Sequence, residues 1–220
     1  MNVDRAVLEQ LRQLKSECDL AEPYIALAIY APEELEKEQI GYSTDEKGRS
    51  LASDEDGAWQ PGWIVIGRTE LTGDPIIVDM NEAGQPVSCL MHGMDEWGAG
   101  SYIAGSIGQF RDAVAKIRLL MASHRPQVAN TPVTCAALDD AVADIAAADD
   151  YADADTWQAL LEPSYRMARQ QEEALIGSIR SMSGQGMKIK DIADALGIPL
   201  KLAYSFLKKV KSEADNRWSE

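Results

Sequence analysis

Trp63-Ile-Val-Ile66, Ile76-Ile-Val-Asp-Met80 and Val87-Ser-Cys-Leu-Met91 are three short apolar runs that follow one another closely near the middle of the chain. Each has the length and the β-branched content of a buried strand. The segments between them, Leu71-Thr-Gly-Asp-Pro75 and Asn81-Glu-Ala-Gly84, carry residues that favour tight turns. Strands spaced this closely pair as hairpins. We therefore predict a small, mostly antiparallel sheet in an α+β fold, rather than a doubly wound parallel sheet.

Helical periodicity flanks this sheet on both sides. A first helix is expected to begin at an Asp4 N-cap and to run to about Cys18. Ser106 and Thr134 are each expected to begin a further helix, and a short helix is expected over residues 156–161. The apolar positions behind these predictions are Val7, Leu11, Leu14 and Cys18, then Ile107, Phe110, Val114, Ile117 and Met121, then Leu138, Val142 and Ile145, and finally Trp157, Leu160 and Leu161.

The chain is strongly acidic, with 21 Lys and Arg against 36 Asp and Glu and a net charge of −15. Such a charge repels nucleic acid and anionic lipid and attracts cationic partners. It is unevenly distributed: residues 126–163 contain eight acidic residues and no Lys or Arg, whereas residues 164–220 contain ten basic and seven acidic residues. The change of sign predicts a separate C-terminal unit.

Composition also limits the compartment and the kinds of site. The longest apolar stretch, Tyr24–Ala31, is far shorter than the roughly 20 residues that span a bilayer, and the first residues lack the apolar core of a signal peptide. Cys18, Cys89 and Cys135 are widely separated, which supports neither a disulfide framework nor a structural zinc site. We expect a cytoplasmic protein with no membrane partner, no metal and no cofactor.

A resemblance to a known family extends over about residues 59–161. The order, spacing and type of the central residues resemble the SUKH superfamily, which groups bacterial immunity proteins with fungal cell-wall synthesis regulators. The segment Ala154–Leu161 is similar to the helix that closes that fold. The central residues that carry the resemblance are Trp59, Pro61, Trp63–Gly67, Thr72–Ile76, Val78-Asp79, Gly84, Pro86-Val87, His92-Gly93, Trp97, Ile103-Ala104, Ser106 and Phe110.

The resemblance implies a binding role, because bacterial members of this superfamily typically neutralise toxins, often nucleases, by binding the toxin domain. It supplies no catalytic residue. A cationic toxin domain would suit the acidic charge of this chain. Trp59 ends a polar loop, where an aromatic side chain is either an anchor for a partner or part of the core. The predicted partner-binding residues are Trp59, the neighbouring loop acids Asp54, Glu55 and Asp56, and Asp74, which also suits an Asx-turn before Pro75.

The last third of the chain predicts an all-helical unit over residues 164–220, and residues 1–163 are expected to fold without it. Residues 187–211 have a pattern similar to a helix-turn-helix: a small residue at Ala193, a turn at Gly197, and Pro199 at the start of the next helix. If this unit binds DNA, its second helix would present four side chains to the major groove: Lys201, Tyr204, Ser205 and Lys208.

Two features of the sequence favour protein binding over DNA binding as the role of these helices. No arginine lies on the candidate helix, although arginine makes the commonest specific base contact. The acidic remainder of the chain would also oppose the approach of DNA. DNA-dependent regulation is therefore the alternative to toxin binding.

A hydrolase is a third, weaker alternative. The nearest candidate groups for catalysis lie around the strands, and no GxSxG, Walker, GxGxxG or HExxH motif accompanies them. In a chain this acidic, a histidine close to several aspartates is expected by chance. The groups considered are Asp74, Asp79, His92, Asp95, Ser101 and Ser106.

Overall fold

The computed structural model describes residues 3–91, 97, 100–123 and 131–216, with side chains described up to residue 210. The chain divides into two compact units. The first comprises Met1–Arg118 and Asp139–Pro163, and the second comprises Leu119–Leu138 and Ser164–Glu220. The predicted contiguous unit 1–163 differs from this division, because residues 119–138 group with the C-terminal helices.

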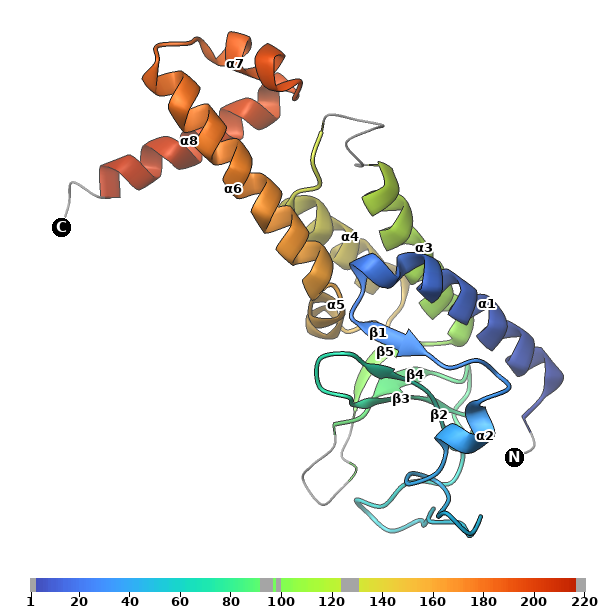
Figure 1. Ribbon diagram of the computed structural model, residues 1–220. Coiled ribbons are helices and arrows are strands. Elements are labelled where there is room, and N and C mark those ends of the chain that lie inside the picture. The colour runs from blue at the N-terminus through green and yellow to red at the C-terminus, as the bar shows by residue number, and fades with distance from the viewer. Residues whose placement is uncertain (1–2, 92–96, 98–99, 124–130, 217–220) are drawn as a thin grey trace. The chain divides into compact units, whose positions relative to one another are not determined.

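The first unit is built on a five-stranded sheet in the order β1-β2-β3-β4-β5, and all of its neighbouring strands are antiparallel (Figure 1). This confirms the predicted α+β fold with an antiparallel sheet. Each of the three predicted strand runs overlaps one of the three central strands, although β2 extends beyond its run to Thr69 and β3 begins one residue before its run, at Pro75. The strands are β1 (Leu27–Ile29), β2 (Trp63–Thr69), β3 (Pro75–Asp79), β4 (Val87–Cys89) and β5 (Ser101–Ala104).

Helices of the first unit lie on both sides of this sheet. The first unit contains α1 (Arg5–Ala21), the 3-10 helix η1 (Glu22–Tyr24), α2 (Leu35–Glu38) and α5 (Ala154–Leu160), together with most of α3 (Ile107–Ser123) and part of α4 (Cys135–Ala148). In Figure 1, α1 and α5 lie on one side of the sheet, and α2 with the loop after it lies on the other.

The caps of these helices follow the sequence prediction. The side chain of Asp4 accepts a hydrogen bond from the Ala6 backbone N–H and begins α1, which runs three residues beyond the expected end. Ser106 Oγ accepts from the Gln109 N–H at 3.2 Å and Thr134 Oγ1 accepts from the Ala137 N–H at 3.2 Å, so both are N-caps.

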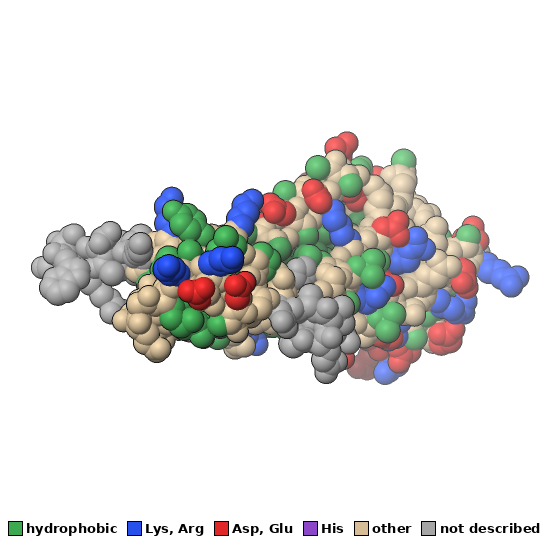
Figure 2. Space-filling view, turned by 90° about the horizontal axis from the view of Figure 1, so that it is seen from above, with side chains coloured by type: hydrophobic (Ala, Val, Ile, Leu, Met, Phe, Trp, Pro, Cys, Tyr) green, Lys and Arg blue, Asp and Glu red, His purple; other side chains and the backbone are tan. Residues whose placement is uncertain are grey.

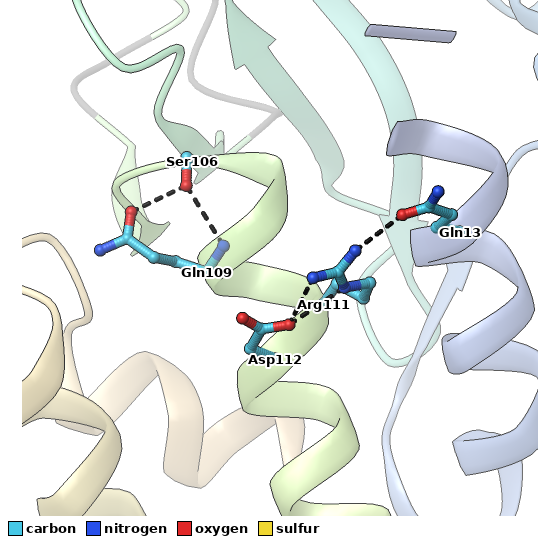
Figure 3. A network of polar contacts seen from close by, with 5 residues as sticks. All are labelled: Gln13, Ser106, Gln109, Arg111 and Asp112. Atoms are coloured by element: carbon cyan, nitrogen blue, oxygen red, sulfur yellow. Dashed lines mark hydrogen bonds and ion pairs between the residues drawn. The ribbon is translucent and has the colours of Figure 1, made fainter. Parts of the chain in front are cut away.

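Side chains from distant segments join α3, α5 and the sheet into one core. The rings of Phe110 and Trp157 meet edge to face with centroids 6.0 Å apart, and both side chains are fully buried. Trp157 Nε1 donates to the Ile103 carbonyl of β5 at 2.9 Å. Arg111 of α3 donates to Gln13 of α1 at 2.7 Å, and this bond links the two helices (Figure 3).

The opposite face of the sheet is covered by the loop between α2 and β2. Trp59 of this loop packs on Val65 of β2, Ile77 of β3 and Leu90, the residue after β4. Around it stand the rings of Tyr42, Trp63 and Trp97, with centroid distances of 5.1 to 5.7 Å to Trp59. We call Tyr42, Trp59, Trp63 and Trp97 the aromatic cluster.

The second unit is helical. It contains most of α6 (Glu162–Gly184), together with α7 (Ile189–Leu196) and α8 (Leu200–Asn216), and this confirms the predicted all-helical C-terminal part with a helix-turn-helix pattern. Pro163, which could have been expected to end the helix over residues 156–161, is instead the second residue of α6. Proline is tolerated there because an N–H group in the first turn has no acceptor within the helix.

The turn between α7 and α8 depends on Gly197. This residue has the left-handed conformation, with φ 64° and ψ 30°, and its N–H bonds back to the last turn of α7. Ile198 then enters the core of the unit, where it joins Ile179, Ile192, Ala193, Ala203 and Phe206.

Candidate functional site

Two tyrosines that are far apart in the sequence stand together at the β5 edge of the sheet. Tyr102 belongs to β5 and is 39% exposed, and Tyr151 belongs to the segment between α4 and α5. Their ring centroids lie 4.9 Å apart and the rings are nearly perpendicular, at 82°. Such an edge-to-face pair holds both rings in a defined orientation at a partly exposed position.

A single carboxylate orients both phenols. Tyr151 Oη donates to Glu82 Oε1 at 2.6 Å, and Tyr102 Oη donates to Glu82 Oε2 at 3.4 Å. The hydrogen bond to Glu82 is the main cause that raises the pKa of Tyr151. The pKa of Tyr102 is raised by burial first and by the charge of Glu82 next. Both phenols therefore stay protonated at neutral pH, and Tyr151 makes the shorter of the two hydrogen bonds to Glu82.

Further aspartates surround this pair. The carboxylate of Asp149 is buried and holds the segment in place, accepting from the N–H groups of Gly105 at 2.8 Å and Tyr151 at 3.0 Å. Asp153 caps α5 through Thr156, whose side-chain hydrogen bond is the main cause that lowers the pKa of Asp153. Asp150 is exposed to solvent.

A groove of about 630 Å³ runs beside the tyrosines. Asp150 and Asp153 are its charged lining residues, and none of the described residues that line it is basic. We call Glu82, Tyr102, Asp150, Tyr151 and Asp153 the acidic–tyrosine surface. It combines two oriented aromatic rings with three carboxylates, which are groups that attract an ammonium or guanidinium ion.

Sequence reasoning missed this surface. Its residues come from the β3–β4 loop, from β5 and from the segment after α4, and none of them belongs to a recognisable motif. The signal in the sequence was Tyr151, an aromatic residue within residues 126–163, which contain eight acidic residues and no Lys or Arg.

Trp59 was considered either a surface anchor or part of the core, and the structure places it in the core. The side chain is 2% exposed, and its Nε1 donates to the Trp63 carbonyl at 3.2 Å. The assignment of Trp59 as a partner-binding residue is therefore corrected, because a ring enclosed by the aromatic cluster offers no surface to a partner.

The three predicted loop acids remain exposed. Asp54, Glu55 and Asp56 lie in a turn that is closed by a hydrogen bond from the Ser53 N–H to the Trp59 carbonyl at 2.9 Å. They form a second acidic group, on a different loop from the acidic–tyrosine surface.

Asp74 is half-buried in the turn between β2 and β3. Its carboxylate accepts from Thr72 Oγ1, and its N–H donates to Thr69 Oγ1 at 3.1 Å. The charge of Asp74 also contributes, after burial, to raising the pKa of Cys89 to about 11. These contacts give Asp74 a structural role in the turn.

Of the side chains considered for hydrolysis, Asp79 and Ser106 form hydrogen bonds that stabilise turns and helix ends. Asp79 accepts from Trp63 Nε1 at 3.1 Å and from the Asn81 N–H at 2.8 Å. Ser106 caps α3 and donates to Gln109 Oε1 at 2.8 Å (Figure 3). Ser101 is exposed on β5, and His92 and Asp95 lie outside the described residues.

Neither a metal centre nor a membrane span is found in the part of the chain that the structure describes. Within it, no three His, Cys, Asp or Glu side chains gather in a way that could hold a metal ion. None of its helices combines the length and the apolar character that crossing a bilayer requires.

The four predicted residues of the C-terminal unit lie together. Lys201, Tyr204, Ser205 and Lys208 follow a spacing of three, one and three residues along α8, and all four are exposed. They therefore share one side of that helix.

Comparison of the chain with protein-family models, with curated proteins and with solved structures finds no match.

Proposed function

We propose that the α+β unit binds a positively charged protein through the acidic–tyrosine surface. The observation that carries this proposal is the Tyr102–Tyr151 pair, held by the shared carboxylate of Glu82. An aromatic ring that is already oriented loses little conformational entropy when a partner packs on it, and tyrosine is enriched among the residues that dominate binding energy.

The chemistry of the surface favours a basic side chain of the partner. A lysine or arginine over the face of a tyrosine ring gains on the order of 0.5–2 kcal/mol, depending on how far it is desolvated. Asp150 and Asp153 line the adjoining groove and can accept charge-assisted hydrogen bonds from the same cation. Residues 126–163 lack Lys and Arg, so no neighbouring positive charge in that stretch opposes the cation.

The resemblance to the SUKH superfamily supports the kind of partner. It implies a toxin domain, often a nuclease, and nucleases tend to be cationic because their substrate is anionic. A chain with a net charge of −15 would attract such a domain over a distance and accelerate its association. Under this proposal the chain neutralises the partner by occupying its basic surface.

The experiment captures proteins from a lysate of the native host on the immobilised full chain, and then measures binding kinetics of the retained protein. The Tyr102→Ala variant should dissociate about 30-fold faster, which corresponds to about 2 kcal/mol for an aromatic hot spot. The Asp150→Asn variant should associate more slowly. The association rate should also fall as the Debye length shrinks from about 10 Å at 0.1 M salt to about 3 Å at 1 M.

The matched control is the variant Asp54→Asn/Glu55→Gln, which removes charge from the other acidic loop. It should slow association through the loss of long-range attraction and leave the dissociation rate unchanged. If Tyr102→Ala binds like the parent chain while the control dissociates faster, the loop at residues 54–56 is the contact surface. If no variant or salt concentration changes the kinetics, binding does not use either acidic surface.

A further inference from the structure

A second exposed surface lies on α8 and has the opposite charge. We call Lys201, Tyr204, Ser205 and Lys208 the basic face of α8. Tyr204 is 63% exposed, and Leu200 at the start of the helix is 51% exposed. Figure 2 shows basic side chains bordering hydrophobic ones over the helices at this end of the chain, with acidic side chains beside them.

The local fold presents this face to solvent. The opposite side of α8 is buried through Ala203 and Phe206, which pack with Ile192, Ala193 and Ile198. The left-handed turn at Gly197 ends α7, and the Pro199 carbonyl accepts from the Ala203 N–H in the first turn of α8. This packing fixes the orientation of α8 within its unit, so that its first turns carry the exposed lysines.

The charge on this helix is unusual for so acidic a chain. Residues 200–210 contain three lysines and no Asp or Glu. Lys209 lies 3.3 Å from Glu172 of α6 and stands over the Phe206 ring at 5.3 Å, so it is engaged within the unit. Among the described side chains, Lys201 and Lys208 form no ion pair, and their charge is available to an anionic partner.

The distribution of charge limits the kind of partner. Two copies of the same face would bring lysines against lysines, which disfavours a symmetric dimer through α8. The middle of the exposed side is occupied by Lys201 and Lys208 rather than by apolar residues, which disfavours insertion into a membrane surface. A helix with this pattern is suited to the groove of a nucleic-acid duplex, where phosphates line both sides.

We propose that the basic face of α8 binds duplex DNA, with the helix in the major groove and with contacts that go mainly to phosphates. Lys201 and Lys208 supply the charge and Tyr204 supplies a hydroxyl donor. Ser205 Oγ donates to the Leu202 carbonyl at 2.8 Å, so its proton is used within the helix. Because the face has no arginine for bidentate contact with guanine, the binding has little sequence preference.

This proposal differs from the ranking that the sequence suggests, and the reason is the kind of contact: the acidic remainder of the chain weakens DNA binding but is screened by salt. The missing arginine argues against sequence-specific reading, but it does not argue against contact with phosphates. Two phosphate contacts correspond to a slope of about −1.8 in the logarithm of affinity against the logarithm of salt concentration. Affinity should therefore fall about tenfold between 50 and 200 mM salt, which leaves little binding at physiological salt.

The test uses the full chain and two fluorescent 20-base-pair duplexes of unrelated sequence, with anisotropy measured at 50 and 200 mM NaCl. Both duplexes should bind at 50 mM with affinities within about threefold of each other, and both should weaken about tenfold at 200 mM. The Lys201→Glu/Lys208→Glu variant should lose this binding. Because both side chains are exposed, its circular dichroism and its unfolding midpoint should match the parent chain.

The matched control is Lys37→Glu/Lys47→Glu, which makes the same change of net charge on exposed residues of the first unit. It should keep most of the affinity. Salt at 50 mM screens the long-range repulsion between the added negative charge and DNA more than it screens the direct contacts of Lys201 and Lys208 with phosphates. The proposal is overturned if neither duplex binds at 50 mM, or if the control loses as much affinity as the α8 variant. It is also overturned if polyglutamate at the same charge concentration displaces the duplex completely, since the face would then accept any polyanion, acidic proteins included.

Discussion

The side-chain amide of Gln39 takes the place of a neighbouring strand beside Val65. Gln39 is 3% exposed, and its Oε1 accepts from the Val65 N–H at 3.0 Å while its Nε2 donates to the Val65 carbonyl at 2.9 Å. β1 pairs with β2 only from Gly67 onward, so this amide satisfies backbone groups that β1 does not reach.

Replacement of Gln39 by leucine should destabilise the chain. The N–H and the carbonyl of Val65 would be left buried without partners, at a cost of about 2 kcal/mol. Urea unfolding followed by tryptophan fluorescence measures the difference. Gln158→Leu, at an exposed position of α5, is the control and should change stability by less than about 0.5 kcal/mol. Equal stability of the two variants would show that the amide contacts contribute nothing.

Burial of Cys18 predicts a dependence on pH. The thiol is 4% exposed, and burial, followed by the charges of Asp19 and Glu17, raises its pKa to about 12. Since ionisation is easier in the unfolded chain, the contribution of this thiol to stability is complete below pH 9 and is lost between about pH 9 and pH 12.

The reactivity of Cys18 at pH 8 provides the measurement. In a Cys89→Ser/Cys135→Ser background, the thiolate fraction of Cys18 should be about a thousandfold lower in the folded chain than in the unfolded chain. A thiol reagent should therefore label Cys18 rapidly in urea and very slowly in buffer. Rapid labelling in buffer would show that the first helix opens or that the thiol is accessible.

Among the elements, the turn from α7 to α8 depends on one backbone conformation. Gly197 adopts φ 64°, where a residue with a Cβ atom is strained by about 1 kcal/mol or more. Gly197→Ala should therefore destabilise the helical unit by about 1 kcal/mol. Gly177→Ala has the same chemistry within α6, where nothing apart from the adjoining helix backbone lies within 4 Å of the added methyl group. It should stabilise the unit by about 1 kcal/mol, because alanine favours a helix interior.

Thermal unfolding monitored by circular dichroism distinguishes the two glycine variants by the sign of the shift. A fall in the midpoint for both would mean that the space around Gly177 is needed for packing. No change for Gly197→Ala would mean that the turn accommodates another conformation.

The central strands could be predicted from the sequence, but the residues that cover the β5 edge of the sheet could not. The three central strands follow from local apolar runs and turn residues, which act over a few positions. The outer edge of β5 is instead covered from a distance: the Tyr102 carbonyl accepts from the Asp153 N–H at 3.3 Å and the Ile103 carbonyl accepts from Trp157 Nε1 at 2.9 Å. No local pattern specifies which distant residue protects an exposed strand edge.

For the whole molecule, the division into units changes what truncation should do. The sequence predicts that a fragment ending at Pro163 folds by itself. In the structure, residues 119–138 group with the C-terminal helices, and this segment contains the buried side chains Met121, Val133 and Leu138. The fragment 1–163 should therefore lose cooperativity, bind a hydrophobic dye and exchange amide hydrogens rapidly over residues 119–123 and 131–138.

A fragment that ends at Asn216 is the control for this truncation and should unfold like the full chain. If the fragment 1–163 unfolds with the same cooperativity and midpoint as the full chain, the first unit does not need the contacts that residues 119–138 make in the second.

The three central strands, the helix caps at Asp4, Ser106 and Thr134, and the turn at Gly197 follow from the order of residues, whereas β1, β5 and α2 were not predicted. The predicted features rest on periodicity and on backbone preferences that act within a few residues. Only the tertiary structure shows that Trp59 is buried and that Tyr151 bonds to Glu82 across 69 residues. Those placements depend on how distant segments pack, because burial and contact are properties of the assembled core and are not encoded by neighbouring residues.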